Sequence, residues 1–262
     1  MNDAVLYEVK GAVAVITFNR PDRLNAWNGD LHEGYFTSLD RAAADPDVRV
    51  IVVTGAGRGW CAGADMDVLQ GIQSDTASDS AGAMNRPTWN HTHAMTIPKP
   101  VIAAINGACA GLGFVHALAC DLRFAAEGAK FTSAFSRRGL IAEHGCAWTL
   151  PRLVGQAVAL DILLSGRVFL AEEAERMGVV NRVFAPEALL AETLAYADDL
   201  AVNASPASMA AMKMQVYTHP SLPIGEALAD ANRLMTESFG RPDFKEGVAS
   251  FVEKRPPAFP PL

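Results

Sequence analysis

Two glycine-rich segments could hold a negatively charged oxygen atom. Residues 59–66 (GWCAGADM) and residues 106–113 (NGACAGLG) each follow an apolar run typical of a buried strand, and each opens a helical segment. Glycines at such turns let a ligand approach the backbone closely, and the first N–H groups of a helix can bind it. Either segment alone is more typical of tight strand–helix packing. Two segments that meet at one point would stabilise a developing oxyanion.

One carboxyl group after these segments, Glu143, lies in an apolar stretch that also contains Trp148. Burial among apolar groups would raise its pKa and make it a competent base near neutral pH. Its alternative role is structural. It could cap the helix expected from Gly145, or it could form an ion pair with Arg137 or Arg138.

The chain lacks the usual signatures of nucleotide, metal and redox sites. No Gly-Lys-Ser/Thr follows the glycine-rich segments, and GxGxxG spacing fails because residue 116 is His. His91 and His93 have no acidic or cysteine partner nearby, so we expect no metal site, and they line a pocket or face solvent. His116, Asp121 and His144 are expected to be structural. The four cysteines share no CxxC spacing and are expected to be buried free thiols: Cys61, Cys109, Cys120 and Cys146.

The composition is that of a globular protein. Of 262 residues, 50% are hydrophobic and 19% charged, which excludes a chain that is disordered throughout. The net charge of −7 argues against nucleic-acid binding through phosphates. The N-terminus lacks the pattern of a signal peptide, and Asn106 and His116 interrupt the most apolar stretch, residues 101–119. We therefore expect a soluble cytoplasmic protein that does not enter the membrane.

Strands and helices alternate over the first part of the chain, which predicts an α/β fold. Asp30, with Glu33 three residues later, is expected to cap the helix over residues 31–44. A further helix is expected over residues 112–119. Strands are expected over residues 13–18, 48–54, 100–105 and 120–125.

The last part of the chain is helical. Helices are expected over residues 186–203 (with Pro186 at the first helical position), 206–217, 224–239 and 242–254. Their apolar residues exceed what a short helical tail can bury, so they form an oligomer interface or pack back on the same chain. These residues are Leu228, Leu234, Met235, Phe239, Val248 and Phe251.

Several motifs together resemble the enoyl-CoA hydratase/isomerase (crotonase) family. The resemblance runs from about residue 13 to residue 254. It rests on RPDRLNA (20–26), TG…WCAGADM (54–66), PKPVIAAING (98–107), CDLR (120–123), LPRLVG (150–155) and AEEA…GVV (171–180).

This resemblance implies a spiral of ββα units over residues 1–190, as an α/β core. It implies that the helical segment over residues 191–262 forms trimers or dimers of trimers. The substrate would be an acyl-CoA, with coenzyme A as part of the substrate and no tightly bound cofactor. Residues 71–87 are expected to shape the acyl pocket.

The resemblance also implies site residues. The N–H groups of Ala64 and Leu112 would clasp the thioester oxygen, with Gly111 or Gly113 in place of Leu112 after a one-residue shift. Asp65 would also cap the helix that follows it. Arg23 and Lys254 could equally be solvated surface charges. Coenzyme A would be bound by Arg23, Leu24, Ala26, Ala62, Asp65 and Met66, and by Phe251 and Lys254 near the C-terminus.

The sequence departs from the family at two acidic positions. Val115 and Phe135 stand where hydratases of the family carry the glutamates that activate water. Glu143 matches the active-site aspartate of dienoyl-CoA isomerases and 4-chlorobenzoyl-CoA dehalogenases. We therefore expect double-bond isomerisation by Glu143 slightly more than hydration. The alternatives are a thioester or carbon–carbon hydrolase on the same scaffold, and a non-catalytic acyl-CoA-binding paralogue.

Overall fold

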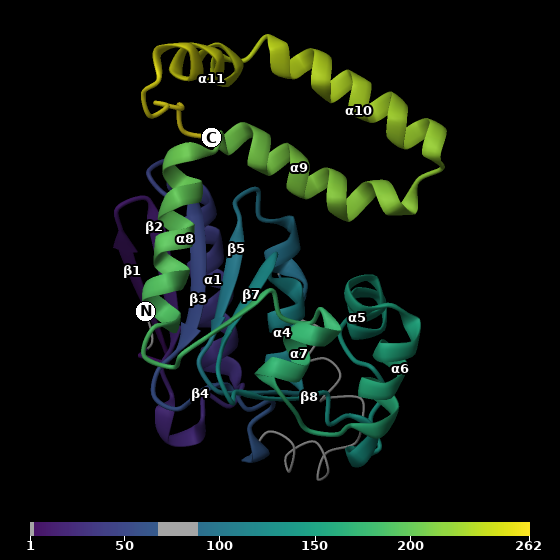
Figure 1. Ribbon diagram of the computed structural model, residues 1–262. Coiled ribbons are helices and arrows are strands. Elements are labelled where there is room, and N and C mark those ends of the chain that lie inside the picture. The colour runs from purple at the N-terminus through teal and green to yellow at the C-terminus, as the bar shows by residue number, and fades with distance from the viewer. Residues whose placement is uncertain (1–2, 68–88) are drawn as a thin grey trace.

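The computed structural model describes residues 3–67 and 89–262. The segment 71–87, which was expected to shape the acyl pocket, lies outside the described residues. A six-stranded sheet forms the centre of the molecule (Figure 1). Its strands pair in the order β1 (Val5–Lys10), β2 (Val13–Phe18), β3 (Val50–Gly55), β5 (Val101–Ile105), β7 (Leu122–Ala126) and β10 (Arg182–Phe184).

A second, smaller sheet contains the strands that follow the central ones. Its order is β4 (Gly59–Cys61), β6 (Ala108–Ala110), β8 (Lys130–Thr132) and β9 (Phe169–Leu170). Strands β3, β5 and β7 are parallel neighbours in the first sheet, and each is followed by β4, β6 or β8 in the second. The chain therefore repeats a long strand and a short strand, and both glycine-rich segments lie in or directly after the short ones.

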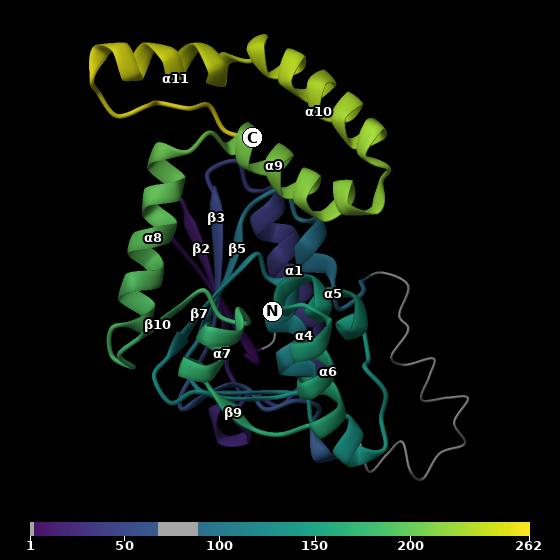
Figure 2. The ribbon, with the colours of Figure 1, turned by 45° about the vertical axis from the view of Figure 1, so that its right-hand side comes forward.

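Helices cover both faces of the central sheet (Figures 1 and 2). On one face, α1 (Gly29–Ala44) and α4 (Leu112–Ala119) bury their apolar side chains with those of β2, β3 and β5. On the other face, α8 (Leu189–Asn203) packs Leu189, Ala197 and Ala201 against the sheet. Because β3 and β5 are covered on both sides, their sequences are nearly continuous apolar runs.

The remaining helices lie beside or above this core. Helices α5 (Cys146–Val154), α6 (Gln156–Ser165) and α7 (Ala171–Met177) follow β8, and 3-10 turns are formed by Pro21–Arg23, His93–Thr96, Ser136–Arg138 and His219–Ser221. Helices α9 (Pro206–Thr218), α10 (Ile224–Phe239) and α11 (Pro242–Glu253) form a layer at one end of the molecule (Figure 2).

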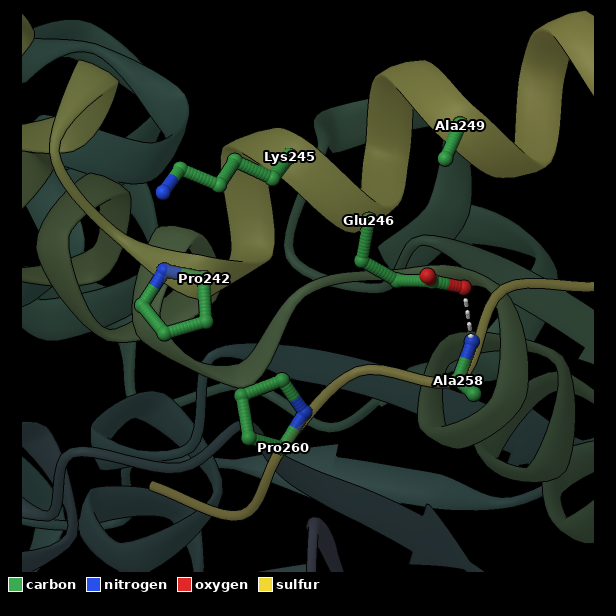
Figure 3. Close-up of a pocket in the computed structure, with 6 residues that line it drawn as sticks. All are labelled: Pro242, Lys245, Glu246, Ala249, Ala258 and Pro260. Atoms are coloured by element: carbon green, nitrogen blue, oxygen red, sulfur yellow. Dashed lines mark hydrogen bonds between the residues drawn. The ribbon is translucent and has the colours of Figure 1, made fainter.

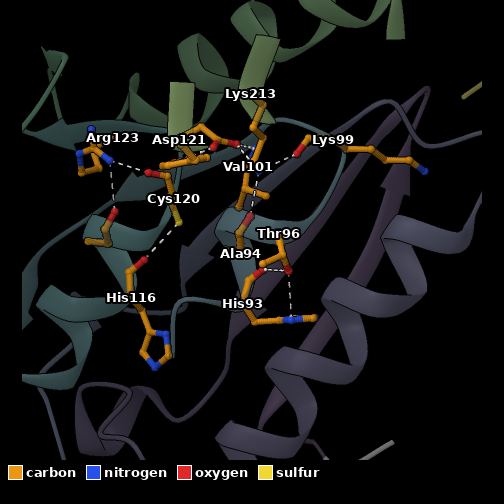
Figure 4. Close-up of polar contacts among 12 residues, drawn as sticks. His93, Ala94, Thr96, Lys99, Val101, His116, Cys120, Asp121, Arg123 and Lys213 are labelled. Atoms are coloured by element: carbon orange, nitrogen blue, oxygen red, sulfur yellow. Dashed lines mark hydrogen bonds and ion pairs between the residues drawn. The ribbon is translucent and has the colours of Figure 1, made fainter. Parts of the chain in front are cut away.

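A buried polar network attaches α9 to the core (Figure 4). The Lys213 ammonium donates to Asp121 Oδ2 at 2.7 Å and to the carbonyl oxygens of Ala94 at 2.8 Å and Lys99 at 3.1 Å. Tyr217 Oη donates to Asp121 Oδ1 at 2.9 Å. Asp121 also accepts a hydrogen bond from the Val101 N–H, so one carboxylate joins α9 to the start of β5.

Most expected elements are present, and the differences are at their ends. Strand β2 and helices α4 and α10 have the expected bounds. The expected cap of α1 by Asp30 is wrong: the helix starts at Gly29, and Asn28 accepts the Leu31 N–H at 3.0 Å. The expected start of α8 at Pro186 is also wrong. The N–H groups of Ala188 and Leu189 both donate to Ala185 O, so residues 186–188 form a turn.

Several apolar side chains of the C-terminal layer are exposed. Leu234 is half-buried, but the other residues named for an interface, Leu228, Met235, Phe239, Val248 and Phe251, are exposed. In this chain they do not pack back on the core. The four cysteines are buried and free, as expected. Across the described residues, no helix is both long and apolar enough to cross a membrane.

Candidate active site

The two glycine-rich segments touch each other. Strands β4 and β6 pair in parallel, with Cys61 opposite Cys109. Each strand is followed by a turn at a glycine with positive φ, Gly63 at 100° and Gly111 at 51°. A Cβ atom on Gly63 would lie 3.0 Å from Ala110 O, and one on Gly111 would lie 3.7 Å from Gly63 Cα. The turns are therefore close to each other, and their positive φ values favour glycine at both positions.

Ala64 and Leu112 each present an N–H group directly after these turns. Ala64 forms a parallel bridge with Trp27, in which Trp27 N donates to Gly63 O at 2.7 Å and Asp65 N donates to Trp27 O at 2.9 Å. That bridge leaves the Ala64 N–H unused. Leu112 is the first residue of α4, where helix geometry provides no acceptor. Within residues 3–67 and 89–262, neither N–H group has a hydrogen-bond partner.

The segment of residues 23–27 lies against the first glycine turn. Ala62 N donates to Leu24 O at 3.0 Å, and Leu24 and Asn25 adopt positive φ values of 49° and 55°. The Asn25 side chain holds this conformation because Nδ2 donates to Gly59 O at 2.7 Å. The Arg23 side chain is exposed, with its guanidinium 3.9 Å from Asp67. The structure thus brings Arg23, Leu24 and Ala26 beside Ala62 and the residues that follow it.

The Asp65 carboxylate is held by an ion pair and by a backbone hydrogen bond. Its Oδ2 pairs with Arg20 Nη2 at 2.8 Å, and its Oδ1 accepts the Asp67 N–H at 3.2 Å, the contact expected of a helix cap. Burial alone would raise the pKa of Asp65, but the hydrogen bonds from Arg20 and the Asp67 N–H outweigh it and lower this pKa. Met66, the next residue, is exposed at the same edge.

Glu143 is half-buried, and burial raises the pKa of its carboxyl group above the ordinary value. Neither structural alternative is observed. Helix α5 has Gly145 at its N-cap with no side-chain cap, and Arg137 Nε donates to Ser165 O instead. In the part of the chain that the structure describes, the Glu143 carboxylate has no ion-pair or hydrogen-bond partner. His144 then adopts a φ of 50°, which is uncommon for a residue other than glycine.

The side chains of Val115 and Phe135, which occupy the two positions where acids are missing, are apolar and buried. Val115 lies on α4, three residues after Leu112, and is 3% exposed, while Phe135 is 4% exposed. Neither side chain can transfer a proton. Trp148 on α5 is partly exposed, and the Arg152 guanidinium lies 3.8 Å from the centre of its ring. Among the described residues, Glu143 is a half-buried acid without an ion-pair partner.

The sequence did not predict a cluster of histidines beside the turn at His144 and Gly145. His91 Nδ1 lies 3.0 Å from His116 Nε2, and the rings of His91 and His144 are 3.9 Å apart between centres. Their positions in the sequence follow no period or motif, so nothing short of the fold identifies the cluster. Among the described residues, no group of three or more His, Cys, Asp or Glu is arranged to hold a metal ion.

Phe251 and Lys254 lie far from the glycine turns within one chain. They belong to the end of α11, which is at the opposite end of the molecule from β4 in Figure 1. Phe251 is 85% exposed, and it borders a hollow of about 390 Å³ that Phe244, Val248 and Phe259 also line. A neighbouring groove of about 470 Å³ separates α11 from the C-terminal tail, where Glu246 accepts the Ala258 N–H (Figure 3).

Comparison with known proteins identifies close relatives over the full fold. Residues 8–261 match the family model described as enoyl-CoA hydratase/isomerase. A probable enoyl-CoA hydratase of Rhizobium meliloti is 38% identical over 98% of both chains, and a 1,2-epoxyphenylacetyl-CoA isomerase of Escherichia coli is 34% identical over 99% of both. The crystal structure of an enoyl-CoA hydratase from Mycobacterium marinum superposes with a TM-score of 0.71 and 52% identity, covering 84% of this chain and all of that one.

Proposed function

Because the chain belongs to the enoyl-CoA hydratase/isomerase family and has its crotonase fold, we propose that it binds an enoyl-CoA and stabilises the enolate of the thioester through the N–H groups of Ala64 and Leu112. The observation that carries this proposal is the contact between the two glycine turns, because each turn is followed directly by one of the two N–H groups that have no partner among the described residues. Donors fixed in this way need no reorganisation when negative charge develops on an oxygen atom.

Glu143 is the proposed acid/base group. In double-bond isomerisation, its carboxylate removes a proton from carbon 2 of a 3-enoyl-CoA, and the electron pair of that C–H bond forms a dienolate. The resulting carboxylic acid then returns the proton to carbon 4, which gives the 2-enoyl-CoA. The half-buried, unpaired state of Glu143 supports this role because burial raises its pKa toward the value a base needs near neutrality. The relative from Escherichia coli is named 1,2-epoxyphenylacetyl-CoA isomerase, so the relatives include an isomerase of a CoA thioester, although its substrate is an epoxide.

Hydration is the second candidate, since other relatives are named enoyl-CoA hydratases. In that reaction Glu143 alone would activate water, because Val115 and Phe135 cannot. A thioester or carbon–carbon hydrolase would use the same carboxylate, whereas a non-catalytic paralogue would only bind the acyl-CoA. Assays with two enoyl-CoA substrates distinguish isomerisation, hydration, hydrolysis and binding without catalysis.

Coenzyme A is proposed to lie along Arg23, Leu24, Ala26, Ala62 and Met66, with Asp65 contributing its backbone because Arg20 holds its carboxylate. Phe251 and Lys254 would reach the coenzyme of a neighbouring subunit. The family resemblance implies such a homotrimer or dimer of trimers. No tightly bound cofactor enters this proposal. The four buried free thiols support a reducing compartment, the cytoplasm.

The test uses crotonyl-CoA and, separately, a 3-enoyl-CoA in deuterated water, with products followed by mass spectrometry. We expect the 3-enoyl-CoA to become its 2-enoyl isomer. Glu143→Gln should lower kcat by about 10²- to 10⁴-fold, because the amide cannot accept the proton. The affinity for acyl-CoA should stay within about threefold, since the N–H groups and the coenzyme contacts remain.

Glu175→Gln is the matched control, because Glu175 is an exposed residue of α7 and the chemical change is the same. It should leave kcat unchanged. Formation of 3-hydroxyacyl-CoA from crotonyl-CoA would favour hydration, and release of free coenzyme A would favour a hydrolase. Binding without turnover of either substrate would favour the non-catalytic paralogue. Full activity of Glu143→Gln would overturn the role of Glu143.

A further inference from the structure

Four of the six histidines form one cluster next to the candidate site. They come from four separate segments: His32 from α1, His91 from the stretch before β5, His116 from α4 and His144 from the turn before α5. His91 lies at the centre. It is 8% exposed, its Nδ1 is 3.0 Å from His116 Nε2, and its ring centre is 3.9 Å from that of His144 and 5.7 Å from that of His32.

His116 connects this cluster to both glycine turns. It follows Leu112 by four residues on α4, so the two side chains share one face of the helix about 6 Å apart. Its ring stacks on Trp27 with centres 3.9 Å apart, and the Trp27 backbone holds both neighbours of Ala64 by hydrogen bonds. The His116 ring points away from the network around Cys120 and Arg123 (Figure 4), so that network does not hold it.

His144 connects the cluster to Glu143. Its φ of 50° and that of Gly145, 81°, make a tight left-handed turn directly after the carboxyl group. The segment containing His91 packs on this turn, because a Cβ atom at Gly145 would lie 3.3 Å from Thr92 Cγ2. A turn with a non-glycine residue in this conformation needs surrounding contacts to persist, and the His91 ring supplies one.

The hydrogen bond between His91 and His116 has a defined direction. Both rings are neutral, because burial lowers the pKa of His91 to about 3 and that of His116 well below its ordinary value. His116 Nδ1 is buried and has no partner among the described residues. A buried N–H without an acceptor is rarer than an unpaired acceptor, so the proton of His116 is on Nε2 and is donated to His91 Nδ1. His91 then carries its own proton on Nε2.

We propose that His91 is a positioning residue for Glu143. It accepts from His116, which is fixed to the helix of Leu112 and to the bridge of Ala64, and it packs on His144, which adjoins Glu143. The contacts from Trp27 to His116, His91 and His144 thereby hold the Glu143 carboxyl group at a fixed position relative to the two N–H groups. This inference rests on the proposed function, because it depends on Glu143 transferring the proton.

Two substitutions separate the two links of His91. His91→Phe keeps a ring against His144 but cannot accept from His116, whereas His91→Asn keeps an acceptor near the position of Nδ1 but loses the ring. We expect each to lower kcat about 10- to 100-fold with KM changed by less than about threefold, because misplacing a reacting group affects the chemical step. His93→Phe is the control: His93 is two residues away and pairs with Asp40 at the surface. It should leave both constants unchanged.

The pH profile of kcat/KM distinguishes a positioning role from a loss of folded protein, because less folded protein lowers the rate without moving the midpoint. When the turn loosens, water should reach Glu143, and the acidic midpoint of kcat/KM should move down toward that of an ordinary carboxyl. The titratable groups around the His91–His116 pair are His32 and Tyr35 of α1, Cys120 after α4 and His144. In a Glu143→Gln background, His91→Phe should change the residual rate by less than about twofold, because there is then no carboxyl to position.

The outcomes distinguish this inference from the proposed function. An unchanged kcat and acidic midpoint in both His91 variants, with activity lost in Glu143→Gln, would overturn the positioning role alone. Equal losses from His91→Phe with and without Glu143 would mean that His91 only supports the fold, and would overturn it as well. Full activity of Glu143→Gln would overturn the proposed function and this inference together.

Discussion

The pKa values of Asp65 and Glu143 are shifted in opposite directions. Asp65 accepts from Arg20 and from the Asp67 N–H, which keeps it ionised and committed to holding the turn. Glu143 has burial as the cause of its raised pKa, with no cation beside it among the described residues. Environments that separate the pKa values of neighbouring acids commonly divide their roles. This difference fits the proposal that Asp65 has a structural role and that Glu143 exchanges the proton.

This difference predicts the pH dependence of activity. Glu143 must be ionised to remove a proton, so kcat/KM should fall as the pH falls through its pKa and should reach a plateau above it. Because burial raises this pKa, the midpoint should lie above the ordinary range of glutamic acid. The rate of 3-enoyl-CoA isomerisation, measured from acid to neutral pH, gives the midpoint. His91 cannot account for such a limb, since its pKa is about 3. A midpoint at the ordinary carboxyl value would contradict this prediction.

Helix α4 and strand β4 are held together at a distance that requires glycine. A Cβ atom on Gly113 would lie 2.2 Å from Cys61 O and 2.8 Å from Cys61 Cβ. The obstacle includes backbone, so it cannot rotate away as the end of a flexible side chain would. The same contact holds the first turn of α4 against the strand that leads to Ala64. The separation of the two N–H groups is therefore a property of two packed elements.

Gly113→Ala should separate these elements. Overpacking of this kind costs about 1–3 kcal/mol, which for a chain of this size corresponds to a fall in Tm of about 3–10 °C. Thermal unfolding gives the shift, and the kcat of the folded protein should also fall. Gly225→Ala is the control, because a Cβ atom at this position of α10 meets nothing within 4 Å. It should leave Tm unchanged or raise it slightly. Equal Tm values for Gly113→Ala and the unsubstituted protein would refute the packing argument.

At the scale of the whole molecule, the C-terminal layer exposes an apolar face. Ile224, Leu228, Met235 and Phe239 lie along one side of α10 and are exposed, whereas the charged residues Glu226, Asp230, Arg233 and Glu237 lie on the opposite side. Helix α9 is joined to the core through Lys213 and Asp121, so the layer is held to the core with this face outward. A second copy of the chain would bury it.

The family resemblance implies a homotrimer or a dimer of trimers, and burial of this apolar face is what we expect such an assembly to provide. Light scattering coupled to gel filtration should give about three or six times the 27.9 kDa of one chain. Met235→Lys puts a charge into the apolar face and should shift the distribution toward smaller species, since burying an unpaired charge is costly. Glu226→Lys, on the opposite face, should leave the mass unchanged. A monomer at every concentration tested would refute this assembly and with it the proposed roles of Phe251 and Lys254.

Local patterns in the sequence determined much of this protein. Strand β2 and helices α4 and α10 follow from hydrophobic period and from glycine and proline positions. The glycine turns were identified from their flanks, and Glu143 was identified from the family resemblance. The first residue of α1 did not follow, because Asp30 has the same capping chemistry as Asn28. Which one caps depends on the chain leaving the bridge between Trp27 and Ala64, a contact across 37 residues.

Only the tertiary structure decided how distant residues meet. The contact between Gly63 and Gly111 needs the parallel pairing of β4 with β6, and the contacts of His91 with His116 and His144 join segments with no shared period. Side-chain types and their spacing carry local preference, whereas burial, hydrogen-bond partners and the pKa of Glu143 depend on what the fold places around each group. The sequence therefore identified the candidate acid, and the fold determined that it has no ion-pair partner among residues 3–67 and 89–262.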